Sequence, residues 1–97
     1  MNRELRNFVR TYLDLEMAYD TKGWLRPTLL GFNEHFVNNV RSGLEEILRD
    51  RSLTVGEYEG LTAIEFPDED TLYKYLEDMY AFLFEGRPEQ PEPPEDF

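Results

Sequence analysis

The sequence predicts an all-α fold, a small bundle of about four helices followed by a disordered acidic C-terminal tail. Apolar residues recur at spacings of three and four over three long stretches, as on one face of a helix. Residues that commonly cap helices precede these stretches. The last stretch, RPEQPEPPEDF, is rich in Pro and Glu and cannot enter a core. We therefore expect one helical domain at residues 1–86 and a disordered tail at residues 87–97.

The first two long helices are predicted from their apolar faces. One spans residues 3–18, with Asn2 as N-cap and fraying near Glu16, whose charge would enter the apolar face. The other spans residues 29–51. Gly43 lies at the edge of its apolar face, where a neighbouring helix could approach closely.

Residues 19–28 are predicted to form a loop, because Gly23 and Pro27 interrupt any helical pattern. Trp24, the sole tryptophan, has two possible roles. It could close the end of the core together with Leu25, or it could face a partner, as tryptophan often does at interfaces.

Two further helices are predicted from their caps. Thr54 and Glu57 have the spacing of a capping box, which begins a short third helix. The last helix is expected to start near Asp68 or Asp70, where acids favour a helix N-terminus, and to end at Glu85 before a glycine and a proline.

Charge is distributed unevenly along the chain. Residues 1–50 hold 8 acidic and 7 basic residues, whereas residues 51–97 hold 13 acidic and 3 basic ones, within a net charge of -11. Such a field attracts basic partners and repels nucleic acid and anionic membranes. The sequence starts without a signal-peptide pattern and holds no apolar run of about 18 residues, so we expect a cytoplasmic protein with no membrane partner.

The residues for most kinds of catalysis are missing from the sequence. There is no cysteine, and His35, expected on the polar side of its helix, is the single histidine, so no zinc site is predicted. The acids of PDEDT lack the spacing of a calcium loop, and no phosphate-binding glycine loop or nucleophile elbow is present. We expect no catalytic residue, metal, cofactor, small-molecule substrate or bound nucleic acid, and hence no enzyme.

The last helix carries aromatic and acidic residues together. On a helical wheel its apolar arc spans roughly 200°, wider than the stripe of an ordinary surface helix. Either this helix is enclosed by neighbours on two sides, or its flanking residues Tyr73 and Tyr75 stay exposed beside the acids. An exposed ring beside a carboxylate would suit a basic protein partner. The candidate contact residues are Glu57, Tyr58, Glu59, Asp68, Glu69, Asp70, Tyr73, Tyr75, Glu77 and Asp78.

In character, these acids and rings resemble the surface of small immunity proteins of bacterial toxin systems, including colicin-type and contact-dependent growth inhibition families. The resemblance is carried by EYE at 57–59, DED at 68–70 and the residues that follow on the last helix. It implies a cytoplasmic inhibitor that neutralises a co-encoded basic toxin, often a nuclease, by tight one-to-one binding. Two alternatives remain open: a DNA mimic that blocks a DNA-binding enzyme, or an accessory subunit anchored by the Trp24 loop.

Overall fold

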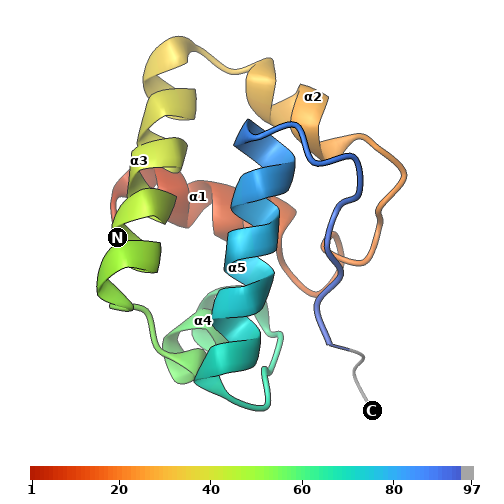
Figure 1. Ribbon diagram of the computed structural model, residues 1–97. Coiled ribbons are helices and arrows are strands. Elements are labelled where there is room, and N and C mark those ends of the chain that lie inside the picture. Colours follow the sequence, from red (N-terminus) through yellow and green to blue (C-terminus); the bar gives the residue numbers. More distant parts are fainter. Residues whose placement is uncertain (95–97) are drawn as a thin grey trace.

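Five α-helices and their connections form the computed structural model, which describes residues 1–94 (Figure 1). The helices are α1 (Arg3–Tyr12), α2 (Leu25–Leu30), α3 (Glu34–Asp50), α4 (Val55–Thr62) and α5 (Glu69–Phe84). No strand occurs within the described residues, so the all-α prediction is confirmed, with five helices rather than about four. Helix α1 packs on α3 and α4, and α3 packs on α5.

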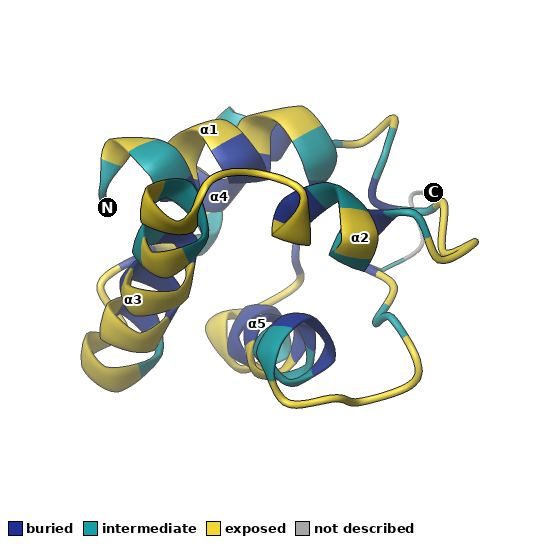
Figure 2. Ribbon diagram, turned by 90° about the horizontal axis from the view of Figure 1, so that it is seen from above, coloured by how far each residue is buried: buried dark blue, intermediate teal, exposed yellow. Residues whose placement is uncertain are grey.

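The core lies where the apolar faces of these helices meet. In Figure 2 the buried parts of α1, α3 and α5 face the interior, and the exposed sides of α1 and α3 face outward. The largest enclosed aliphatic side chains come from α1, α2, α3 and α5, and they include Leu5, Leu25, Leu29, Leu44, Leu72 and Leu76. Burying each of them contributes about 1.5–3 kcal/mol, which makes this interior the main source of stability.

Helix α1 is shorter than predicted, since it ends at Tyr12 rather than continuing to residue 18. The Asp14 carboxylate accepts a hydrogen bond from the Met17 backbone N–H at 3.0 Å, which closes a turn in place of another helical turn. The Leu15 N–H donates to the Thr62 carbonyl at 2.8 Å. These two bonds redirect the chain and fasten it to the end of α4.

The predicted helix over residues 29–51 is interrupted near its start, and the predicted loop over residues 19–28 contains the beginning of α2. Helix α2 ends at Leu30, and the Asn33 side chain caps a new helix by accepting a hydrogen bond from the Phe36 N–H at 2.9 Å. The apolar periodicity continues through this break, which is why periodicity alone merged the two helices.

The caps of α4 and α5 are confirmed. In the capping box of α4, the Thr54 hydroxyl accepts from the Glu57 N–H and the Glu57 carboxylate accepts from the Thr54 N–H, both at 3.0 Å. Asp68 caps α5, and Gly86, at a φ of 77°, follows its C-terminal end.

Residues 87–94, the described part of the predicted tail, form no helix and lie against the domain (Figure 1). Pro93 is buried, and the Tyr19 hydroxyl donates a hydrogen bond to the Pro94 carbonyl. The remaining part of the predicted tail, residues 95–97, lies outside the described residues.

The Tyr73 hydroxyl joins α5 to the segment between α3 and α4. It accepts a hydrogen bond from the Leu53 N–H at 3.0 Å and donates one to the Leu53 carbonyl at 2.9 Å, with all three groups buried. Tyr73→Phe leaves two buried backbone groups unpaired, so we expect it to lower the free energy of unfolding by about 2 kcal/mol. Urea denaturation followed by circular dichroism measures this loss.

Tyr12→Phe is the matched control for that experiment, because no hydrogen bond to the Tyr12 hydroxyl occurs within residues 1–94. This variant is expected to stay within about 0.5 kcal/mol of the wild type. Equal stabilities of the two variants would show that the Tyr73 hydroxyl does not fasten the segment.

Candidate functional site

Six exposed carboxylates belong to α4, to the connection after it and to the start of α5, at one end of the molecule (Figure 1). We name this surface the acidic end. Its residues are Glu57 and Glu59 on α4, Glu65 in the connection, and Asp68, Glu69 and Asp70 at the start of α5. Five of the six were among the predicted contacts. Glu65 was missed because it belongs to no helical face.

A cluster of three buried rings supports the acidic end from inside. Tyr58 on α4 packs edge-on against Phe66 of the connection, with ring centroids 5.5 Å apart. Tyr75 on α5 lies 5.3 Å from Phe66 and 6.5 Å from Tyr58. Such edge-to-face and tilted contacts hold rings in defined positions. The cluster therefore fixes α4, the connection and α5 relative to one another.

The expectation of exposed tyrosines is wrong. Tyr58, Tyr73 and Tyr75 are only 0%, 1% and 4% exposed, so none of them offers a ring to a partner. Helix α5 is enclosed because α3 covers one flank and Phe66 covers the other, which confirms the alternative derived from its wide apolar arc. Burial raises the pKa of both the Tyr58 and Tyr75 hydroxyls well above the ordinary value.

Four carboxylates of the acidic end already have partners within the chain. Asp70 and Glu69 lie 3.0 and 3.5 Å from the Arg51 guanidinium. The Thr71 N–H donates to Asp68, and the Thr54 N–H donates to Glu57, and these bonds hold the pKa of each carboxyl below its usual value. These four residues therefore stabilise the local structure, through helix caps and ion pairs, as well as adding negative charge.

Asp78 and Glu77 lie further along α5, and only Asp78 has a partner within residues 1–94. The Asp78 carboxylate is 3.0 Å from Lys74 Nζ and also pairs with Arg87. Partial burial opposes ionisation there, but the hydrogen bonds from Lys74 and Arg87 outweigh it and lower the pKa of Asp78. Within residues 1–94, the exposed carboxylates of Glu59, Glu65 and Glu77 have neither an ion pair nor a hydrogen bond.

A second exposed surface, the aromatic end, lies at the opposite end of α3. Tyr12 contacts Trp24 and Phe32 at centroid distances of 6.0 and 6.2 Å, and Phe32 contacts Phe36 at 4.5 Å. Leu30 beside them is 54% exposed and Phe32 is 38% exposed. Sequence reasoning singled out only Trp24 here. The cap signal of Asn33 just after LLGF could have indicated the break between two helices, which leaves Leu30 at a helix end and Phe32 in the connection.

Trp24 is neither fully buried in the core nor fully exposed to a partner. Leu25 is fully buried, whereas Trp24 is half-buried, with its indole N–H donating to the Asp20 carbonyl at 3.1 Å. Leu25 therefore closes the core, and Trp24 covers the edge of it.

No group of three or more His, Asp or Glu side chains within residues 1–94 is placed to hold a metal ion. His35 is exposed, as predicted. No helix in the described part of the chain is both long and apolar enough to cross a bilayer. Comparisons with protein-family models, with curated proteins and with solved structures gave no match.

The cap of α5 makes stability depend on acid pH. Because folding lowers the pKa of Asp68, its contribution is complete above the unfolded-state value of about 4 and is lost as pH falls through the lower folded-state value. Asp68→Asn removes that titration. We expect the wild type to exceed this variant in stability most clearly at neutral pH, and the difference to shrink as pH falls below the unfolded-state value of about 4.

Urea denaturation at pH 7 and at pH 3 measures that difference, with Glu65→Gln as the control. Glu65 has no partner within residues 1–94, so this control removes one carboxylate without breaking an intramolecular contact. A constant difference between Asp68→Asn and the wild type across this range would contradict the expectation.

Proposed function

We propose that this chain is an inhibitor protein of the immunity type, which binds a basic toxin through its acidic end and blocks it. A nuclease is the leading class of toxin, because an enzyme that binds nucleic acid must present Lys and Arg to phosphates. The inhibitor itself performs no catalysis in this proposal, and it acts in the cytoplasm.

The observation that carries the proposal is that Glu59 and Glu65 of the acidic end, and Glu77 further along α5, are exposed carboxylates without a partner within residues 1–94. Their charge is not cancelled within the described chain, so it remains available to a cationic partner. The buried ring cluster beneath them limits the conformational entropy lost on binding. The tyrosines thus contribute by positioning the acids, and the acids make the contacts.

A pull-down from nuclease-treated native cells tests the proposal, with the wild type and Glu59→Lys/Glu65→Lys as baits. The supporting result is one small basic protein, retained at one-to-one stoichiometry by the wild type only. Its nuclease activity should fall when the wild type is added and should persist with the variant. Several DNA-binding enzymes that duplex DNA displaces would overturn the proposal in favour of DNA mimicry.

The aromatic end favours a second candidate, an accessory subunit of a larger complex. Its exposed Leu30 and Phe32 beside Trp24 match the apolar, aromatic composition of interface centres. An assembly that persists in high salt and binds both baits equally would support this candidate against the inhibitor.

A further inference from the structure

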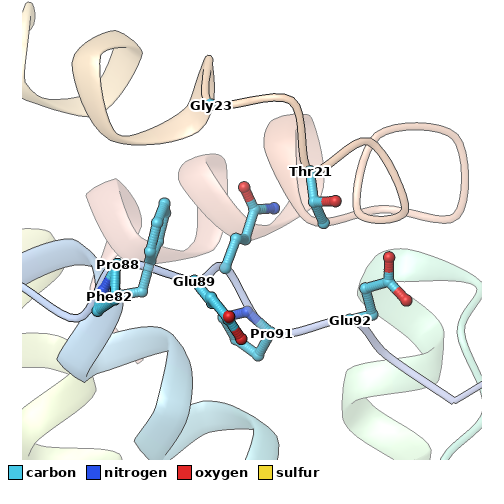
Figure 3. A pocket seen from close by; sticks show the side chains of 8 residues that line it. Thr21, Gly23, Phe82, Pro88, Glu89, Pro91 and Glu92 are labelled. Carbon is cyan, nitrogen blue, oxygen red and sulfur yellow. The ribbon is translucent and has the colours of Figure 1, made fainter.

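A cavity of about 550 Å³ lies beneath residues 88–92 of the C-terminal segment, between that segment and the loop that includes Thr21 and Gly23 (Figure 3). This volume is within the range of ordinary ligand sites. Phe82 at the end of α5, together with Pro88 and Pro91, supplies the apolar part of its lining. Glu89 and Glu92 supply carboxylates to the same lining.

The segment is fixed on both sides of the cavity. Arg26 donates from Nε to the Phe82 carbonyl at 2.8 Å and from Nη2 to the Arg87 carbonyl, and its guanidinium lies 4.1 Å from the Phe82 ring centroid. At the far side, the Tyr19 hydroxyl donates to the Pro94 carbonyl. The segment is therefore held at both ends of the cavity.

Gln90, which also lines the cavity, has an unsatisfied side chain. Its amide nitrogen and oxygen are both shielded from solvent, and neither has a hydrogen-bond partner within residues 1–94. Leaving a buried polar group unpaired costs about 1–3 kcal/mol. The terminal torsion of glutamine is soft, so the amide can turn toward the cavity. A carboxamide offers one donor and one acceptor edge, which complement the C=O and N–H of a peptide group.

The charge of the lining selects among peptides. Glu89 and Glu92 are exposed and have no ion pair within the described chain. Two nearby cations are engaged, since Arg26 binds two carbonyls and Arg87 pairs with Asp78. Lys22, in the facing loop, forms no ion pair within residues 1–94, so it leaves the charge of Glu89 and Glu92 available. A Lys or Arg side chain could lay its methylene groups along Pro88, Pro91 and Phe82 and bring its charge near Glu89 or Glu92.

We infer that this cavity binds an extended peptide segment that carries Lys or Arg, with Gln90 pairing to its backbone and with Glu89 and Glu92 neutralising its cation. The inference rests on the proposed function, because the basic partner would supply the segment. It adds a second contact region to the acidic end, at the C-terminal segment.

The test uses the full-length, ¹⁵N-labelled protein and a capped Gly-Arg-Gly-Arg-Gly peptide as the probe, followed by nuclear magnetic resonance. Gln90 is the single glutamine of the chain, so its side-chain amide signals can be assigned without ambiguity. We expect these signals to shift saturably with the arginine peptide and to stay unchanged with capped Gly-Glu-Gly-Glu-Gly. Glu89→Ala/Glu92→Ala, which adds no second glutamine, should weaken the binding of the arginine peptide about fivefold.

Glu34→Ala/Glu46→Ala is the matched control, because it removes the same charge from exposed positions of α3 that belong neither to the lining of the cavity nor to the acidic end, and it should bind the peptide like the wild type. Unmoved Gln90 signals, or equal shifts with both peptides, would overturn the inference. If the peptide fails to bind while the pull-down still captures a basic toxin, the inference fails and the proposed function stands. Peptide binding with no captured toxin would support the site and overturn the function.

Discussion

Glu59→Lys/Glu65→Lys is expected to slow association with the captured basic partner about 10- to 100-fold at low ionic strength. Both carboxylates are exposed and have no partner within residues 1–94, so the replacement changes the field of the acidic end without removing an intramolecular contact. The effect should nearly vanish in about 1 M salt, where the screening length falls to about 3 Å. Stopped-flow association at two ionic strengths measures it.

Glu34→Lys/Glu85→Lys is the control for that measurement, since it causes the same change in net charge at the other end of the molecule. Glu34 begins α3 and Glu85 follows α5, far from the contact of Arg51 with Glu69 that joins the opposite helix ends. The lysines also have opposing effects on the two helix dipoles, so the net effect on stability is small. Equal slowing by both double variants would mean that total charge, rather than the acidic end, governs association.

How far the sequence predicts this fold depends on how local each signal is. The caps of α4 and α5 consist of neighbouring side-chain and backbone groups, so they could be placed from the residues around Thr54 and Asp68. The end of α1 depends on a bond from Leu15 to Thr62, far along the chain, and no local pattern encodes it. Periodicity also spans Asn33, whose capping role decides where α3 begins.

The sequence predicted most of the exposed acids of the candidate site, but not the burial of its tyrosines. Acids at the start of a helix stay exposed in most contexts, because burying an unpaired carboxylate is costly. A tyrosine on a wide apolar arc can be buried with its hydroxyl paired, as Tyr73 is at Leu53, or without a hydrogen-bond partner, as Tyr58 and Tyr75 are within residues 1–94. Sequence reasoning also could not separate Glu69, Asp70 and Asp78, which pair with arginine or lysine, from Glu59 and Glu77, which do not.

Gly43→Ala is expected to lower the free energy of unfolding by about 1–3 kcal/mol, the usual range for overpacking. The predicted close approach at this glycine is confirmed, because α1 packs directly against it. An added Cβ would lie 2.7 Å from the Asn2 side-chain nitrogen and 3.2 Å from the Leu5 Cβ. The Asn2 amide also donates to the Asn39 carbonyl at 2.8 Å, so relieving the clash endangers that bond between α1 and α3.

Gly60→Ala is the matched control, and we expect it to change the free energy of unfolding in the opposite direction. An added Cβ at Gly60, near the end of α4, meets nothing within 4 Å, so only the greater helix propensity of alanine acts there, and stability should rise by up to about 1 kcal/mol. The same propensity gain operates at Gly43, within α3, and must be exceeded by the clash. Urea denaturation of both variants therefore tests the close contact between α1 and α3. Destabilisation by Gly43→Ala together with stabilisation by Gly60→Ala would support this contact. Stabilisation by both variants would contradict it.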